Sequence, residues 1–274
     1  MRVLVMGAGY LGRAIASALR GAGHGVVEVT RSGDGSSVAC DIGVAGEVAA
    51  LPKCDVIVHC AASGRGGEEA YRAVYRDGCR NLVECFPGVP VYFTSSTSVY
   101  AQVDGEVVDE ESAAEPERGT GRLFREAEEI VLRSGGVVAR LAGIYGPGRS
   151  VILKKFWEGT AVIEEDGRRY LNQIHRDDAA AALVRMMGKR LSGVYCVSDS
   201  KPLTQRQCYE QLAEKFGKEL PPCGPRDEGR KRGWTHKRVS NAKLRGEGWE
   251  PGYACFLDAV DDILPTLGVR TGLE

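Results

Sequence analysis

The chain has 274 residues, of which 36 are glycine, and its formal net charge at pH 7 is −1. The length is ample for a large buried core, and the balanced charge excludes a generally basic nucleic-acid-binding protein. With 43% hydrophobic residues the sequence is too apolar for a disordered chain, and its glycines follow no Gly-x-y period. Glycine in a globular protein gathers at tight turns and where the backbone approaches a ligand, so the positions of the glycines decide what their excess means.

The cysteines and the apolar runs indicate the cellular compartment of the protein. The nine cysteines are odd in number, and no two are spaced Cys-x-x-Cys. Such thiols are typical of a reducing compartment rather than of a disulfide framework or a zinc site, so we expect no metal. No apolar run approaches the ~18 residues of a membrane span, and the four apolar residues before Gly7 are too few for a signal peptide. We expect a soluble, cytoplasmic protein that acts on a small molecule and binds neither nucleic acid nor membrane.

Strand and helix patterns alternate along the chain. Short apolar runs of the kind that form buried parallel strands occur at 3–6, 26–30, 55–59, 89–94 and 136–141. Apolar residues recur at helical spacing at 11–19, 68–85 and 122–132. Later elements are a helix at 177–187, a strand at 193–197 and helices at 205–216 and 255–264. This alternation predicts an α/β fold, with a doubly wound parallel sheet and helices on both faces.

The regular alternation fades after residue 149, which indicates two units. We expect residues 1–149 to form a dinucleotide-binding domain, to which 173–200 return, and 150–172 with 201–274 to form a small substrate lobe. Within the lobe, residues 226–238 carry seven basic side chains, mixed with acidic and aromatic ones. This segment is either a solvated loop or a site for an anionic group of the substrate.

A glycine motif follows the first expected strand. Gly7, Gly9 and Gly12, with Tyr10 and Leu11 between the last two, match Gly-x-Gly-x-x-Gly and open the first expected helix. The first glycine permits the tight turn, the second lets the backbone approach a pyrophosphate, and the third lets helix and strand pack closely. The helix N-terminus then faces the phosphates. The motif in this context predicts a dinucleotide site.

The end of the second expected strand bears on which dinucleotide is bound. An acidic residue at its tip would bind the ribose hydroxyls of NAD, but here the tip is Thr30, followed by Arg31 and Ser32. A guanidinium can hold a phosphate through two hydrogen bonds, so these residues favour NADP(H), with NAD(H) as the alternative. Glu28 is an acidic residue of the same strand and would argue for NAD(H). It lies two residues before Thr30, however, too deep to reach the ribose.

Six segments in order resemble the extended short-chain dehydrogenase/reductase family, which includes the NAD-dependent epimerases and dehydratases of nucleotide sugars. They are residues 7–12, 40–42, 59–62, 94–100, 140–148 and 174–178. The segments 237–241 and 248–251 are similar to that family's substrate lobe. The resemblance covers nearly the whole chain and implies a Rossmann fold, an oxidoreductase or epimerase-like activity and a dimer formed through helices at roughly 67–85 and 122–134.

The resemblance also implies roles for single residues. Asp41 and Ile42 would contact the adenine, and Ala61 and Ala62 would pass beneath the ribose and phosphates. Thr94 would also belong to the cofactor site.

The remaining roles concern the reacting end of the site. Ser96 matches the family's catalytic Ser or Thr, which hydrogen-bonds the reacting substrate oxygen. Tyr145 would flank the nicotinamide, and Arg149 and His175 would lie near the mouth of the substrate site. Of Asp177 and Asp178, we expect at least one to be only a helix-start residue.

The chain departs from the family at its proton donor. The family uses Tyr-x-x-x-Lys, in which Lys depresses the pKa of Tyr and binds the nicotinamide ribose. The matching positions here are Thr120 and Phe124, and an expected Asn is replaced by Tyr75. Thr is far too weak an acid to act unaided, and Phe cannot bind ribose. The chain therefore resembles the atypical subgroup that lacks the Tyr–Lys pair.

Three hypotheses about this loss remain open. The first is an active enzyme that transfers hydride to or from a carbonyl, alcohol or imine carbon, with Tyr100, Tyr145 or His175 as a substitute proton donor. The second is a catalytically degenerate NADP(H)-binding sensor or regulator. The third is a structural partner without chemistry. The substrate itself cannot be identified from the residues, since one fold hosts many reactions.

Overall fold

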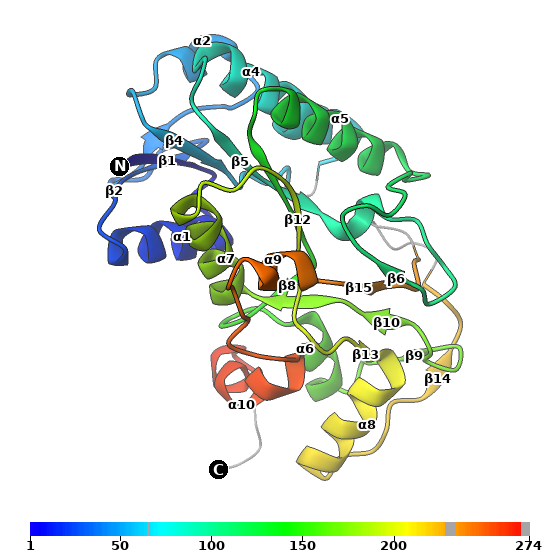
Figure 1. The fold of residues 1–274 in the computed structure, drawn as a ribbon. Coiled ribbons are helices and arrows are strands. Elements are labelled where there is room, and N and C mark those ends of the chain that lie inside the picture. The colour runs from blue at the N-terminus through cyan, green and yellow to red at the C-terminus, as the bar shows by residue number, and fades with distance from the viewer. Residues whose placement is uncertain (65, 228–233, 270–274) are drawn as a thin grey trace.

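The computed structural model describes residues 1–64, 66–227 and 234–269, and its centre is a parallel sheet of seven strands (Figure 1). The strands, in chain order, are β1 (Arg2–Met6), β2 (Gly25–Thr30), β3 (Val38–Ala39), β4 (Val56–His59), β5 (Val91–Ser96), β7 (Val137–Leu141) and β12 (Gly193–Val197). Their order in space is β12-β7-β5-β4-β1-β2-β3, and every neighbouring pair is parallel. The predicted α/β fold is confirmed, although the short β3 at the edge was not expected.

The strand order contains a switch point at β1. The chain proceeds from β1 to β2 on one side, and later elements return to place β4 on the other side. Connections that leave in opposite directions open a crevice at the carboxyl ends of β1 and β4, where ligands bind in open α/β sheets.

Helices cover both faces of the sheet (Figure 1). On one face α1 (Tyr10–Gly21) packs beside α7 (Arg176–Gly188), and on the other α4 (Gly78–Cys85) packs beside α5 (Gly119–Arg133). A short helix, α2 (Ala45–Ala49), contacts α4. In α1 the fully buried Ile15 and Leu19 stand four residues apart on the stripe that faces the sheet.

The helix expected at 68–85 is not one regular α-helix. It begins as α3 (Glu68–Tyr71), continues as a π-helical turn (Arg72–Asp77) and ends as α4. Such turns shift the side chains that follow and occur often at functional sites. Here the turn carries Tyr75, which is buried near the rings of His59 on β4 and Phe93 on β5.

The later part of the chain has a core of its own. It is built from α6 (Val151–Trp157), α8 (Gln205–Phe216) and α10 (Val260–Ile263), with Leu153 and Leu212 fully buried. The helix expected at 255–264 is instead a 3-10 turn (Phe256–Ala259) followed by α10, and the Asp258 carboxylate accepts a hydrogen bond from the Cys255 amide at 2.9 Å.

Short strands and one further helix complete this part of the molecule. The strand pairs are β6 (Val107–Val108) with β15 (Arg238–Val239), β8 (Gly143–Tyr145) with β11 (Gln173–His175), β9 (Ile163–Glu164) with β14 (Cys223–Gly224), and β10 (Tyr170–Leu171) with β13 (Leu203–Thr204). The helix is α9 (Ala242–Gly246). In the described part of the chain, no helix combines the length and the apolar character needed to cross a membrane.

Candidate active site

The glycine turn lies at the switch point and has the shape that the motif requires. Gly7 has φ +94°, and a Cβ built on it would come within 2.2 Å of the Ala61 Cα atom. A Cβ on Gly12 would come within 2.2 Å of the Gly7 carbonyl oxygen. A Cβ on Gly9 would meet no protein atom within 4 Å, so the surface above this residue is open. Two glycines are thus required by the protein itself, whereas the third leaves room for a ligand.

An open crevice of about 560 Å³ lies in front of this turn, lined by Gly9, Tyr10, Arg13 and Arg176 among others. The guanidinium of Arg176 lies over the Tyr10 ring at 5.1 Å from its centroid, and that of Arg149 lies over the same ring at 5.3 Å. The N-terminus of α1, which has no side-chain cap, opens into the crevice. Unpaired amides with nearby guanidinium groups suit phosphate, so the residues present fit the pyrophosphate of a dinucleotide.

A hydroxyl cluster lies at the tip of β2, beside an arginine of α1 that sequence reasoning missed. The Thr30 hydroxyl lies 2.8 Å from that of Ser37, and Arg13 pairs with Asp34 at 2.6 Å. Arg31 and Ser32 are on the exposed side of this turn. Glu28 is held by Arg20, at 2.7 Å, near the far end of α1. Its carboxylate is therefore directed away from the crevice.

The described residues that line this crevice do not include the others that the resemblance places near the cofactor, which are Asp41, Ile42, Ala61, Ala62 and Thr94. The Asp41 carboxylate accepts a hydrogen bond from the Gly43 amide at 2.9 Å, and Ile42 is buried. Ala61 directly abuts Gly7, and the exposed Ala62 follows. Thr94 donates its hydroxyl to the His59 carbonyl at 3.2 Å, which ties β5 to β4.

Ser96 ends β5 and supports the next turn. Its hydroxyl is buried and accepts a hydrogen bond from the Ser98 amide at 3.2 Å, which caps the 3-10 turn Thr97–Val99. Ser98, two residues later, lines the adjacent pocket. The hydroxyl-rich run from Thr94 to Ser98 was the feature that could have indicated Ser98.

The Tyr100 hydroxyl faces the protein interior. It donates to the Asp109 carbonyl at 2.5 Å and accepts from Arg140 at 2.8 Å, while Arg140 pairs with the buried Glu128 at 2.8 Å. Burial raises the pKa of Tyr100 well above its usual value. The ring of Tyr100 lines the pocket, but its hydroxyl is used in this interior network.

Tyr145 and His175 lie together, on β8 and β11. Their ring centroids are 5.4 Å apart, and both side chains are buried. The His175 Nδ1 accepts from the Asp177 amide at 3.3 Å and so caps α7, and burial lowers the pKa of its imidazole. Burial raises the pKa of the Tyr145 phenol. Neither is among the described residues that line the pocket beside Ser98.

Asp177 and Asp178 both lie in the first turn of α7. Asp177 pairs with Arg176 at 2.8 Å. Asp178 accepts from the Gly252 amide at 2.8 Å and the Tyr253 amide at 3.1 Å, so it fastens the C-terminal segment to α7.

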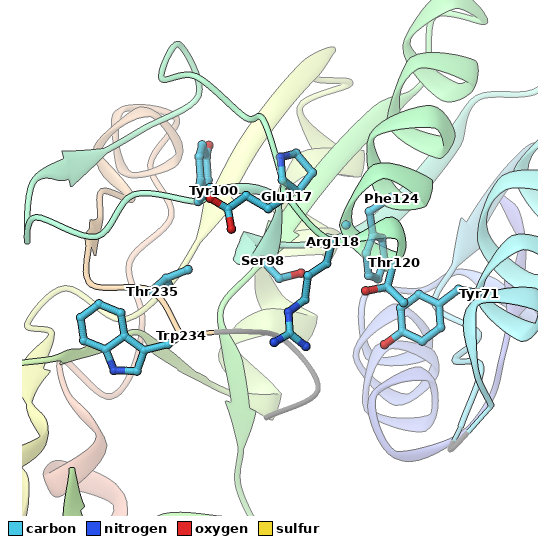
Figure 2. Close-up of a pocket in the computed structure, with 12 residues that line it drawn as sticks. Tyr71, Ser98, Tyr100, Glu117, Arg118, Thr120, Phe124, Trp234 and Thr235 are labelled. Carbon is cyan, nitrogen blue, oxygen red and sulfur yellow. The ribbon is translucent and has the colours of Figure 1, made fainter. Parts of the chain in front are cut away.

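A pocket of about 130 Å³ opens beyond the end of β5 (Figure 2). Its walls come from four parts of the chain, which are α3, the turn after β5, the start of α5 and the segment before β15. The lining residues are Tyr71, Ser98, Tyr100, Ala101, Pro116, Glu117, Arg118, Thr120, Gly121, Phe124, Trp234 and Thr235. Thr120, at the position of the family's Tyr, is part of this wall. Sequence reasoning did not single out Tyr71, Arg118 or Thr235.

The place of the family's Lys and Asn is filled by an aromatic cluster. Phe124 and Tyr75 pack at 4.4 Å between ring centroids, and Tyr71 meets both rings edge-on at 5.8 and 5.1 Å. His59 and Phe93 complete the cluster. Since these rings exclude a charged amine, the loss of Lys is part of a repacked wall rather than an isolated substitution.

Metal and thiol chemistry find no support in the described residues. No group of three His, Cys, Asp or Glu side chains among them could hold a metal ion. All nine cysteines are free thiols, and burial raises the pKa of Cys60 to about 12. Residues 228–233 of the basic segment 226–238 lie outside the described residues, so its two interpretations stay open.

Comparison with solved structures finds the same fold in other proteins. The chain is similar to a Methylobacillus flagellatus protein described as an NAD-dependent epimerase/dehydratase, at 26% identity and TM-score 0.80, over 96% of this chain and 97% of that one. It also shares its fold with human epimerase family protein SDR39U1 (isoform 2), solved with NADPH, at 21% identity and TM-score 0.81, over 97% and 100% of the two chains. MoeE5, solved with UDP-glucuronic acid and NAD, matches at 22% identity and TM-score 0.77, over 92% and 94%.

No curated protein matches the chain in sequence. The model of the NAD dependent epimerase/dehydratase family matches residues 3–197. Together with the glycine turn, this match supports a nicotinamide dinucleotide as the cofactor and favours an enzyme over the degenerate sensor. The chain belongs to the NAD dependent epimerase/dehydratase family.

Proposed function

We propose that the protein is an NADP(H)-dependent oxidoreductase that transfers hydride to or from the carbon of a small carbonyl, alcohol or imine. The observation that carries the proposal is the placement of two sites at one edge of the sheet. The phosphate crevice lies at the end of β1 and the 130 Å³ pocket beyond the end of β5, with only β4 between them. Two strand spacings correspond to about 10 Å, a distance that a dinucleotide spans.

Each end of the cofactor would be held by different groups. Gly9, Tyr10 and Arg176 would bind the pyrophosphate, and Arg31 with Ser32 would bind a 2′-phosphate. Arg13 of α1 pairs with Asp34, which follows Arg31 and Ser32 in the chain, and would add a second guanidinium near that phosphate. When bound, the dihydronicotinamide supplies a hydride to the substrate carbon. The chain itself must bind the substrate, exclude water and provide a proton for the oxygen or nitrogen.

The pocket limits the size of the reacting group. A cavity of about 150 Å³ in another protein holds benzene, so about 130 Å³ suits a molecule of five to seven heavy atoms. Ser98 and Thr120 offer hydroxyls to a carbonyl or imine, and Arg118 offers a guanidinium to an anionic substituent (Figure 2). A small substrate therefore fits this pocket better than a nucleotide sugar.

Consumption of NADPH tests the proposal. NADPH is mixed with the full chain and a panel of small ketones, keto acids and cyclic imines, with cyclohexanone as the ring-sized member. We expect loss of the dihydronicotinamide absorbance with at least one member. Tight NADPH binding without turnover across the whole panel would support the sensor instead.

The expectations about assembly and compartment are part of the same proposal. Helices α4 and α5 lie side by side on one face of the molecule, the place where the resemblance puts a dimer interface (Figure 1). We propose a homodimer through this face and a cytoplasmic location. A mass near 59 kDa by light scattering, twice the chain mass of 29.5 kDa, would support the dimer, and a mass near 29.5 kDa would refute it.

A further inference from the structure

We propose that Thr235 is the proton-donating hydroxyl of the pocket and that Lys237 positions it and replaces its proton. The inference rests on the proposed function, since it identifies the donor for that reaction. It assigns the lost Tyr–Lys role to a Thr–Lys pair on the opposite wall, contributed by the segment that leads into β15.

Lys237 is buried directly behind the pocket wall. Only 3% of the residue is exposed. Its Nζ donates to the Thr235 hydroxyl at 2.9 Å and to the Tyr100 carbonyl at 2.7 Å. Thr235 and Tyr100 both line the pocket, whereas Lys237 does not. The Lys237 ammonium is therefore connected to the pocket by one hydrogen bond, the one it donates to the Thr235 hydroxyl.

The charges around Lys237 favour release of its proton. Among the described residues no carboxylate forms an ion pair with the Lys237 Nζ, and an ammonium buried without such a partner is costly. Burial, with the positive charge of Arg169, lowers the pKa of Lys237 to about 7. A group that titrates near neutrality is well suited to exchange protons during a reaction.

The other titratable groups near Thr235 and Lys237 are bound to other residues or lie on another wall of the pocket. His236, between the two residues, stacks on Tyr170 at 5.3 Å, and its Nδ1 accepts from the Tyr170 amide at 3.3 Å. The Tyr100 phenol is held in the interior network with Arg140. Glu117 and Arg118 line the pocket from the α5 side.

The step balances as a two-electron reduction of the substrate. The Thr235 hydroxyl gives its proton to the substrate oxygen or nitrogen as the C=O or C=N π bond opens, and Lys237 gives a proton to the Thr235 oxygen. A bound dihydronicotinamide would supply the hydride for the new C–H bond and would account for the two electrons that the substrate gains. The neutral Lys237 amine then takes a proton from water. Oxidation of an alcohol or amine follows the reverse order.

Titration of Lys237 by NMR tests the pair without substrate or cofactor. The full chain is labelled with [13Cε]-lysine, and the Lys237 signal is identified by its loss in Lys237→Met. We expect a midpoint near pH 7 for Lys237. The same midpoint should be found in Lys243→Met, a control that removes another Nζ donating to a backbone carbonyl, that of Val194 at 2.9 Å. A Lys237 midpoint near the ordinary ~10.4 would overturn the inference.

Kinetics with NADPH and cyclohexanone supply the second readout. We expect Thr235→Val and Lys237→Met to lower kcat about 100-fold with little change in KM or in NADPH affinity. Thr235→Ser, which keeps the hydroxyl, should restore most of the rate, and Lys243→Met should match the wild type. In the wild type kcat should fall as pH rises through 7, because the donating form is the ammonium, and this break should vanish in Lys237→Met.

The possible failures are distinguishable. If NADPH does not bind, or nothing in the panel is reduced, the proposed function fails and the inference fails with it. If the wild type reduces cyclohexanone but Thr235→Val and Lys237→Met keep its rate and pH profile, only the Thr–Lys pair is refuted.

Discussion

The crevice at β1 and the pocket beyond β5 differ in how they are built. In the crevice the decisive groups are backbone atoms, because a Cβ on Gly7 or on Gly12 would stand only 2.2 Å from the nearest protein atom. In the pocket they are side chains, and Phe124 and Tyr75 stand where the family has Lys and Asn. The first region keeps the family pattern and the second has lost it.

This difference has a physical reason. A phosphate site made of amides and a helix end depends on close backbone packing, which few substitutions can preserve. A proton donor is a single side chain, and another side chain can reach the same pocket from a different wall. The aromatic cluster shows that the wall was repacked as a unit, with ring contacts between 4.4 and 6.5 Å.

Substitution of Gly7 should have the largest effect. Gly7→Ala places a Cβ 2.2 Å from the Ala61 Cα at φ +94°, so we expect a loss of about 4 kcal/mol in the free energy of unfolding and loss of NADPH binding. Gly23→Ala is the control, because its φ is +81° but no atom lies within 4 Å. It should cost only about 1 kcal/mol. Urea denaturation measures both losses. An equal loss of unfolding free energy in Gly7→Ala and Gly23→Ala would show that the contact with Ala61 is unimportant.

Truncation of Phe124 tests the repacked wall. Phe124 is 4% exposed and packs on Tyr75 and Tyr71, so Phe124→Ala should destabilise the protein by about 3–5 kcal/mol. Phe124→Leu, which leaves a smaller cavity, should cost less than half as much. Denaturation of both variants measures this. A cost below about 1 kcal/mol for the alanine variant would contradict a tightly packed cluster.

The same cluster should make stability depend on pH through His59. Burial lowers the pKa of His59 to about 4, whereas an ordinary histidine titrates near ~6.5. Between these values the unfolded chain binds a proton that the folded chain does not, so stability should fall as pH falls from 6.5 to 4, by up to about 1.4 kcal/mol per pH unit. His59→Phe should flatten this slope and His24→Gln should keep it. An unchanged slope in His59→Phe would refute the assignment.

Substitution of Arg31 should have the smallest effect, and that effect should be limited to the binding of NADPH. If it holds the 2′-phosphate, Arg31→Ala should weaken NADPH binding about ten-fold and leave NADH binding unchanged. Arg133→Ala, an exposed arginine on α5 that pairs with Glu129 at 3.0 Å, is the control. Fluorescence titrations with both cofactors check this, and wild-type affinity for NADH equal to or above that for NADPH would remove the argument for NADP(H).

The sequence was sufficient for the features that depend on local pattern. Apolar runs and the Gly7–Gly12 spacing predicted the parallel sheet and the turn at its switch point, because strand burial and tight turns constrain residue type directly. It could not predict the π-helical turn that buries Tyr75, since no residue in Arg72–Asp77 marks it. Nor could it place Thr235 and Lys237 beside the turn after β5, far away in the chain, because that proximity arises only when β15 pairs with β6.

The candidate proton donors show the same limit. Tyr100 follows the hydroxyl-rich run in sequence, and its ring does line the pocket. Its hydroxyl, however, is oriented by Arg140 and the Asp109 carbonyl, which are contacts that no local pattern records. The direction of a buried hydroxyl depends on tertiary hydrogen bonds, so residue type and spacing alone do not fix it.

The most direct test of the account is a titration of NADPH against the wild type and Gly9→Ala. A Cβ on Gly9 meets no protein atom within 4 Å, so it would occupy only the space assigned to the pyrophosphate. We predict saturable NADPH binding by the wild type, at least ten-fold weaker binding by Gly9→Ala and a melting temperature that changes by only a few degrees. Equal affinity in the two proteins would contradict the placement of the dinucleotide over this turn.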